Sequence, residues 1–266
     1  IEKKINKKTK ALVITNYAGG SSNMEKILRL RNKYNFYLIE DAAHSIFSKY
    51  NKKYLGTFGD LSTMSFHQTK NIHCGEGGAL FINNKRFIDR AISIFKKGTN
   101  KQKFLEKKVK EYSWIDLGSS FEMSELHSYI LFQSLKGWKA KFKQRKKVWN
   151  NYDNRLSTFE KKKFLRRPKF LKKVHHNAHI YYILVKKASR DKILRYLNKN
   201  KVNATFHYLP LHESSYYKKR FKKKLKLKVS RDIADRIIRL PISHSLEKKQ
   251  FEYIIKFLIK SLKLYG

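Results

Sequence analysis

The sequence lacks the features that mark secreted and membrane proteins. Cys74 is the only cysteine, so no disulfide can form within the chain, and a reducing cytoplasm is expected. No apolar run approaches the ~20 residues needed to cross a bilayer, which predicts no membrane insertion. The charged start IEKKINKKTK, which begins with Ile1 rather than Met, is unlike a signal peptide. A chain of 266 residues is long enough for one large domain or two smaller ones.

Acidic residues are also scarce, with 20 Asp and Glu against 62 Lys and Arg and a formal net charge of +42. Such an excess is typical of proteins that bind nucleic acids or anionic membranes. However, only 14 of the basic residues are Arg and 48 are Lys, and no nucleic-acid-binding motif lies beside their clusters. Abundant Asn, Ile, Tyr and Phe favour drift in an A- and T-rich genome instead. We therefore expect no specific nucleic-acid partner.

The first half of the chain alternates short apolar runs with helical spacing. ALVIT (11–15) and FYLIE (36–40) flank a helical pattern at Met24–Tyr34. A strand, a helix and a strand at this spacing predict a right-handed βαβ unit in a parallel sheet. Further strands are expected at 61–66 and 78–83, and a helix at 85–95.

The second half is more helical. The pattern is helical from Met123 to about Arg155, and the basic stretch 160–174 is expected to be a linker or an irregular segment. Strands are then predicted at 180–185 and 203–208, and helices at 189–200, near 230 and at 247–264. The sequence thus predicts an α/β fold in which residues 1–135 form a large domain. Residues 136–266 are expected to form a connecting helix and a smaller α+β domain.

The residues with the clearest chemical meaning lie between Glu40 and Asn83. Asp41 ends a predicted strand, and acidic groups at strand ends of α/β sheets commonly face a ligand. SFHQTKN (65–71) places Lys70 in a loop before the glycine-rich CGEGGAL (74–80), where a lysine can be buried enough to become a nucleophile. Each feature alone is ordinary, because strand-end carboxylates often cap turns and most of the 48 lysines must be solvated. CGEGGAL also lacks the spacing of a P-loop or a dinucleotide fingerprint.

Taken in order, EDAAH (40–44), GTFGD (56–60), SFHQTKN and GEGGALFIN (75–83) resemble the core of a known family. This family is the sugar aminotransferases among the fold type I, aspartate-aminotransferase-like enzymes that use pyridoxal 5′-phosphate (PLP). More narrowly, five further blocks resemble the transaminases that form dTDP-4-amino-4,6-dideoxygalactose. These blocks are KKGTNKQKF (96–104), YSWIDLGSSFEMSEL (112–126), NAHIYYILV (177–185), FHYLPLH (206–212) and RLPI (239–242). The resemblance covers nearly the whole chain, from about residue 12 to residue 258.

The resemblance implies a large domain with a mostly parallel sheet and a reaction of PLP-dependent transamination. The amino donor would be glutamate, and the acceptor a nucleotide-linked 4-keto-6-deoxy sugar, dTDP-4-dehydro-6-deoxyglucose. The pathway would be the assembly of a cell-surface polysaccharide such as enterobacterial common antigen.

The resemblance also implies roles for individual residues. Lys70 would form the Schiff base with PLP and move the proton during catalysis, and Asp41 would pair with the pyridine nitrogen. His44 would lie against the cofactor ring, and Ser65 would bind its phosphate. The partners would be a second copy in a homodimer with shared active sites, in which Ser120, within 118–126, approaches the neighbouring cofactor phosphate. The sugar nucleotide would contact His179, His207 and Tyr208, with Asn177 and His212 as further candidates.

Several alternatives remain at this stage. Relatives carry a sizeable portion before the counterpart of ALVIT, so we expect either a fragment truncated at its N-terminus or a decayed or split gene, with exposed sheet edges. The enzyme could act on another nucleotide keto-sugar, or the chain could be an inactive basic binding protein that keeps the fold. Ser119 and Ser120 could simply cap a helix that begins near Met123.

Overall fold

The computed structural model describes residues 1–221 and 225–266 and divides into two compact units. Unit 1 consists of Ile1–Trp138 and Phe170–His179, and unit 2 consists of Lys139–Lys169 and Ile180–Gly266. The predicted boundary at residues 135 and 136 therefore differs from the observed one, which follows Trp138. The return of Phe170–His179 to unit 1 was also not predicted. It occurs because a short strand in this segment pairs with a strand of unit 1.

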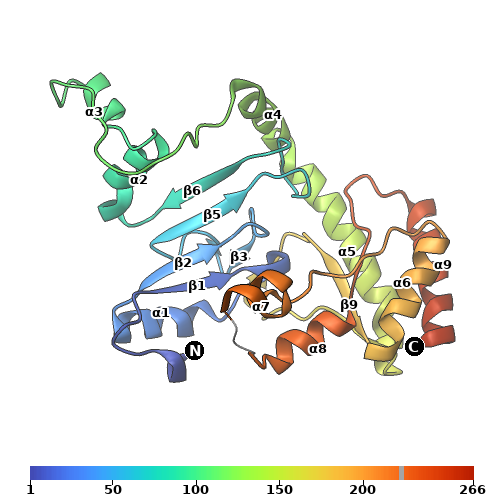
Figure 1. The fold of residues 1–266 in the computed structure, drawn as a ribbon. Coiled ribbons are helices and arrows are strands. Elements are labelled where there is room, and N and C mark those ends of the chain that lie inside the picture. Colours follow the sequence, from blue (N-terminus) through green and yellow to red (C-terminus); the bar gives the residue numbers. More distant parts are fainter. Residues whose placement is uncertain (222–224) are drawn as a thin grey trace. The chain divides into compact units, whose positions relative to one another are not determined.

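The main sheet of unit 1 contains β1 (Ala11–Thr15), β2 (Tyr37–Asp41), β5 (Leu61–Ser65) and β6 (Gly78–Ile82), side by side in that order (Figure 1). β1, β2 and β5 are parallel, and β6 runs antiparallel to β5. Since parallel strands end at the same edge of a sheet, the carboxyl ends of β1, β2 and β5 lie together.

Helix α1 (Met24–Tyr34) connects β1 to β2 and begins and ends where the sequence predicted. The side chain of Asn23 accepts a hydrogen bond from Lys26 N at its start, and Asn35 adopts a left-handed conformation at its end. The helix buries Met24 and Ile27 against one face of the sheet. The other core residues of this cluster are Ile14, Leu38, Tyr50, Leu55 and Val174.

A second, small sheet in unit 1 has the order β4-β3-β8 and was not predicted. It consists of β3 (Lys49–Tyr50), β4 (Lys53–Tyr54) and β8 (Val174–His175). All pairings are antiparallel, with Tyr50 opposite Val174. The expected linker at 160–174 is therefore partly ordered as strand.

The helical pattern from Met123 forms two helices rather than one. α4 (Glu125–Leu135) ends before Lys136, which is extended, and Gly137 has a positive φ of 68°. This left-handed glycine lets the chain turn before α5 (Trp138–Lys161) begins. The remaining helical segments of unit 1 are η1 (Glu2–Lys4), η2 (Tyr17–Gly19), η3 (Lys85–Phe87), α2 (Ile88–Phe95) and α3 (Lys101–Leu105).

Unit 2 contains an antiparallel sheet in the order β10-β9-β7, formed by Ile237–Leu240, Tyr181–Val185 and Leu165–Arg166. The predicted strand at 203–208 is wrong. Thr205 forms only an isolated bridge, and Phe206 and Tyr208 are exposed rather than packed. The helices of unit 2, besides α5, are η4 (Lys187–Ser189), α6 (Arg190–Lys199), η5 (Leu211–Glu213), α7 (Ser215–Phe221), α8 (Lys228–Arg236) and α9 (Lys248–Tyr265).

Aromatic rings fill the core of unit 2. Tyr152 and Tyr181 are fully buried, and their ring centroids lie 4.9 Å apart in a stacked arrangement. Trp149 and Phe251 pack edge-on against this pair. Burial raises the pKa of the Tyr152 hydroxyl, which donates a hydrogen bond to Pro241 O at 2.8 Å. Across the two described stretches of chain, no helix is both long and apolar enough to span a membrane.

Candidate functional site

Two of the predicted site residues end adjacent parallel strands of unit 1. Asp41 is the last residue of β2, in register with Thr15 of β1 and Thr63 of β5, and Ser65 is the last residue of β5. Both are half-buried. Asp41 Oδ1 accepts a hydrogen bond from Ala43 N at 3.1 Å, which holds the carboxylate at the strand end. Ligands commonly bind open α/β sheets at this edge.

Lys70 lies half-buried in the loop between β5 and β6. Its backbone N–H donates to His67 O at 2.9 Å. The loop is closed by two hydrogen bonds at Phe66, whose N–H donates to Gly77 O at 2.8 Å and whose carbonyl accepts from Cys74 N at 2.9 Å. The backbone from which the Lys70 side chain extends is thus held at the carboxyl edge of the sheet.

His67, for which the sequence suggested no role, bonds within this same loop. Its Nδ1 lies 2.9 Å from Thr69 Oγ1, and its Nε2 lies 3.3 Å from Glu76 Oε1. Ser65 Oγ accepts a hydrogen bond from His67 N at 3.3 Å, which leaves the hydroxyl hydrogen of Ser65 available to donate elsewhere. His67 therefore stabilises the loop.

His44 follows β2 and is surrounded by other rings of unit 1. Its Nδ1 accepts a hydrogen bond from Ala18 N at 3.3 Å. Its ring centroid lies 5.5 Å from that of Tyr17 and 4.3 Å from that of His179. His179 is only 6% exposed.

Glu40, which the sequence did not single out, is the most completely bonded carboxylate of this region. It is fully buried and accepts four hydrogen bonds: from Asn16 Nδ2 at 3.0 Å, Gly56 N at 2.8 Å, Phe58 N at 2.7 Å and Gly59 N at 2.9 Å. The EDAAH and GTFGD motifs are therefore joined through Glu40. This joins the loop 55–59 to the end of β2, next to Asp41. Successive strand residues face opposite sides of the sheet, so the side chains of Glu40 and Asp41 have different surroundings.

Ser120 is exposed and forms an isolated bridge with Lys96 in unit 1. The alternative in which Ser119 and Ser120 cap a helix is wrong. α4 begins at Glu125, and Ser124 caps it by accepting a hydrogen bond from His127 N at 3.3 Å.

His207 and Tyr208 belong to unit 2, unlike the residues above. They help to line a hollow of about 200 Å³ together with Arg190, Phe206 and Arg231. Their ring centroids lie 5.0 Å apart. Asp191 and Asp235 line the same hollow and form ion pairs with Arg190 and Arg231, at 2.8 Å and 2.9 Å, so both guanidinium groups already have acidic partners.

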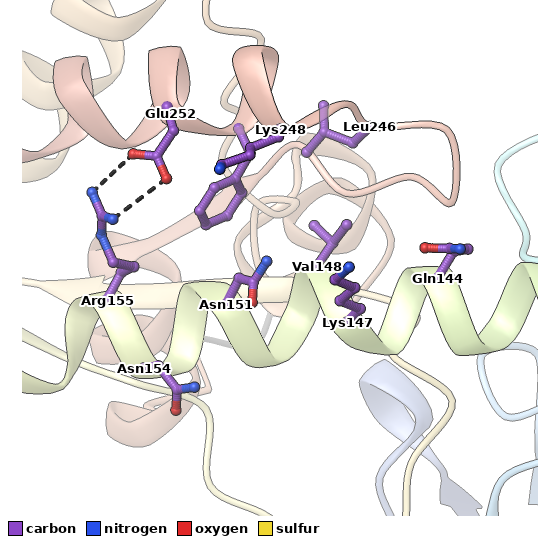
Figure 2. Close-up of a pocket in the computed structure, with 10 residues that line it drawn as sticks. Gln144, Lys147, Val148, Asn151, Asn154, Arg155, Leu246, Lys248 and Glu252 are labelled. Atoms are coloured by element: carbon purple, nitrogen blue, oxygen red, sulfur yellow. Dashed lines mark hydrogen bonds and ion pairs between the residues drawn. The ribbon is translucent and has the colours of Figure 1, made fainter.

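A larger hollow of about 560 Å³ lies between α5 and α9 in unit 2 (Figure 2). Val148 and Phe251 are its buried apolar residues. Figure 2 shows Arg155 and Glu252 pointing toward one another across it, with Arg155 Nη2 2.9 Å from Glu252 Oε2. None of the site residues expected from the sequence lines this hollow.

Comparison with known proteins identifies the family. The model of the DegT/DnrJ/EryC1/StrS aminotransferase family matches residues 1–259, so the chain belongs to this family of PLP-dependent sugar aminotransferases.

Two curated relatives illustrate the range of this family. GDP-perosamine synthase of Escherichia coli O157:H7 is 29% identical over 256 residues, which cover 96% of this chain and 66% of that protein. UDP-4-amino-4,6-dideoxy-N-acetyl-beta-L-altrosamine transaminase of Campylobacter jejuni (strain 81-176) is 29% identical over 212 residues, which cover 79% of this chain and 54% of that protein. The chain thus spans between one half and two thirds of the length of these relatives.

The solved structure of Helicobacter pylori PseC, an aminotransferase involved in the biosynthesis of pseudoaminic acid, matches with a TM-score of 0.90 at 26% identity. The match covers 100% of this chain and 70% of that one. The predicted α/β, aspartate-aminotransferase-like fold is therefore confirmed.

The side chains at the carboxyl edge of unit 1 have the chemistry that PLP requires. They include an amine (Lys70), a carboxylate (Asp41), an imidazole (His44) and a hydroxyl with a hydrogen to donate (Ser65). Over residues 1–221 and 225–266, no group of three or more His, Cys, Asp or Glu side chains could hold a metal ion.

Proposed function

We propose that the chain transfers an amino group from an amino acid to a nucleotide-linked keto-sugar, with PLP at the carboxyl edge of the unit 1 sheet. The observation that carries the proposal is the placement of three groups that the motifs single out. Asp41 and Ser65 end adjacent parallel strands, and Lys70 follows in the closed loop after β5.

Bound PLP supplies an aldehyde that an amine can attack and a ring that accepts electrons from the α-carbon of the donor. Lys70 would hold PLP through its side-chain amine and would serve as the base that takes a proton from the donor α-carbon. Asp41 would keep the pyridine nitrogen protonated, because a nearby negative charge favours the charged form of a base. His44 would lie against the ring, and Ser65 would donate its hydroxyl hydrogen to the phosphate.

We also propose a homodimer with shared active sites. The segment 112–132 of unit 1 exposes many large apolar side chains, and exposed apolar patches of this kind mark interaction sites. A second copy would cover them, and Ser120, which lies in this segment, would approach the cofactor phosphate of the partner. The residues with the largest exposed fractions are Leu117 (90%), Trp114 (71%), Leu126 (68%), Tyr129 (63%), Phe121 (62%) and Phe132 (58%).

For the acceptor, we propose a 4-keto-6-deoxy sugar and contacts from His179, His207 and Tyr208. The narrower resemblance favours dTDP-4-dehydro-6-deoxyglucose with glutamate as donor, in cell-surface polysaccharide assembly such as that of enterobacterial common antigen. The names of the two relatives above contain a GDP-linked and a UDP-linked sugar. GDP- and UDP-linked keto-sugars are therefore the acceptors to compare with dTDP-4-dehydro-6-deoxyglucose. We place the reaction in the cytoplasm, which the single cysteine fits.

The test is to add PLP to the purified chain, record the Schiff-base absorbance, reduce with borohydride and locate the adduct by mass spectrometry. We expect the adduct on Lys70 and its complete loss in Lys70→Ala. Lys85→Ala, which removes another lysine of unit 1, is the matched control and should keep the band. An adduct on a different lysine, or no band in the parent chain, would contradict the proposal. Strong DNA binding without a band would favour the basic binding protein.

A further inference from the structure

Asn71, the residue after Lys70, is held by hydrogen bonds on both sides of its amide. Its Nδ2 donates to Asn177 O at 3.0 Å, and its Oδ1 lies 3.0 Å from His179 Nδ1. Because Oδ1 can only accept, the hydrogen of this second bond belongs to His179. The contact therefore selects the form of His179 that carries a hydrogen on Nδ1.

His179 in turn contacts His44, the residue proposed to lie against the cofactor ring. The rings of His179 and His44 are 4.3 Å apart, with an interplanar angle of 35°. The Nδ1 of His44 accepts from Ala18 N, so neutral His44 carries its hydrogen on Nε2. Asn71, His179 and His44 thus connect the loop that carries Lys70 to the loop that follows Asp41.

Asn177 fixes the backbone through which this connection passes. It is 5% exposed, and its Nδ2 donates to His44 O at 2.9 Å and to Ile46 O at 3.0 Å. Its Oδ1 accepts from His179 N at 3.1 Å. The side chain has little freedom, since Gly19 approaches so closely that an added Cβ there would lie 2.1 Å from Asn177 Oδ1. The segment that presents His179 to Asn71 is therefore held firmly against the His44 loop.

We infer that Asn71 and His179 are positioning residues for Lys70. Their hydrogen bond sets the backbone next to the reactive amine relative to His44, and so relative to the cofactor ring; this role rests on the proposed function. A lysine side chain has several rotatable bonds, so its amine is placed well only if its own backbone is fixed. Misplacement of a reacting group by about 1 Å is enough to slow chemistry strongly.

Two substitutions of His179 separate this hydrogen bond from simple ring packing. His179→Asn places an amide nitrogen near the position of Nδ1, which keeps the donor to Asn71 and removes the ring. His179→Phe keeps a ring and removes the donor. If the hydrogen bond positions Lys70, His179→Phe and Asn71→Ala should weaken PLP binding and slow adduct formation by about tenfold, and His179→Asn by less than about threefold. If the residue only fills space, the order of the two His179 variants should be reversed.

His73→Asn and His73→Phe are matched controls, because His73 is an exposed histidine of the same loop. Both should bind PLP like the parent chain. Melting temperatures of all variants show whether a loss of binding merely follows a loss of folding. A tenfold loss in His179→Phe at an unchanged melting temperature supports positioning.

A second measurement needs no cofactor. In the chain labelled with ¹⁵N-histidine, we expect His179 to show a hydrogen-bonded proton on Nδ1, and Asn71→Ala to remove it. The amide of Lys70 should exchange its hydrogen faster in Asn71→Ala, because the loop loses its anchor.

The outcomes distinguish the two proposals. If the parent chain forms the Lys70 adduct but Asn71→Ala and both His179 variants bind PLP equally well, positioning is wrong and the proposed function stands. If the parent chain forms no adduct, the proposed function fails, and the hydrogen bond seen by NMR is then only structural, which also overturns positioning.

Discussion

Unit 1 and unit 2 both have an apolar core, but they differ in the polar groups buried beside it. In unit 1, buried polar groups join loops to strand ends: Glu40 accepts four hydrogen bonds, and Asp60 accepts from Leu38 N at 2.8 Å and from Arg31 at 2.7 Å. In unit 2, the core is dominated by the aromatic cluster around Tyr152 and apolar residues of α9 such as Leu258, and its main polar group is the partly buried Arg167, which pairs with Asp153 and Glu160.

This difference matters because the two kinds of interaction do different things. Hydrogen bonds are directional, and a buried donor or acceptor left without a partner destabilises the fold. A buried polar network therefore fixes the geometry of the loops that it joins. Apolar burial is non-directional and roughly proportional to area, so it stabilises a scaffold without specifying loop positions. The polar network lies in the unit that carries Asp41 and Lys70, where the proposed function requires precise loop geometry.

The largest expected effect comes from breaking the polar network of unit 1 with Glu40→Ala. The change leaves four N–H donors without their acceptor, so we expect the free energy of unfolding to fall by about 5 kcal/mol. Urea denaturation measures this, and Glu40→Gln, expected to lose about 3 kcal/mol, serves if the alanine variant does not fold. Glu111→Ala, at an exposed position of the same unit, should change stability by less than about 0.5 kcal/mol. A loss below about 1 kcal/mol for Glu40→Ala would show that the network is not needed for stability.

The same contrast explains which parts of the fold could be predicted from sequence. α1 was predicted at its observed bounds, because its apolar spacing is a local signal. The strands β3, β4 and β8 have two residues each, too few to show alternation, and they exist because distant segments pair. The strand expected at 203–208 is limited to one bridge between Thr205 and Arg239, and Phe206 and Tyr208 beyond it are exposed.

The site divides in the same way. Asp41, Ser65 and Lys70 could be named from motifs at strand ends, and their assigned roles stay predictions. Glu40 was missed because a sequence does not show which of two adjacent acidic residues faces the interior. Asn71 was missed because its partner Asn177 is 106 residues away in sequence.

A smaller effect is expected from the apolar core of unit 2. Leu258 is fully buried in α9, and Leu258→Ala should lower the free energy of unfolding by about 3 kcal/mol through lost burial and a cavity. Leu264→Ala in the same helix, where the leucine is 56% exposed, is the matched control and should cost less than about 0.5 kcal/mol. Hydrogen exchange in β9 and β10 locates the loss. Equal losses in the two variants would contradict an apolar core that includes Leu258.

The smallest effect concerns Lys146, a polar exception on the α5 helix of unit 2. Burial lowers the pKa of its amine to about 8, while Asp153 acts in the opposite direction. The pKa of Lys146 is lower in the folded chain than in the unfolded chain, so the unfolded chain binds more protons between about pH 8 and 10.5. The contribution of this group to the free energy of unfolding therefore rises with pH across that window. Lys146→Met should therefore raise the melting temperature at pH 7 by a few degrees, and its advantage over the parent chain should shrink as the pH rises toward 10. Lys143→Met, at an exposed position of the same helix, removes the same charge from the +42 total and corrects for general repulsion. An advantage of Lys146→Met over Lys143→Met that stays constant from pH 7 to pH 10 would mean that burial of the amine costs unit 2 no stability.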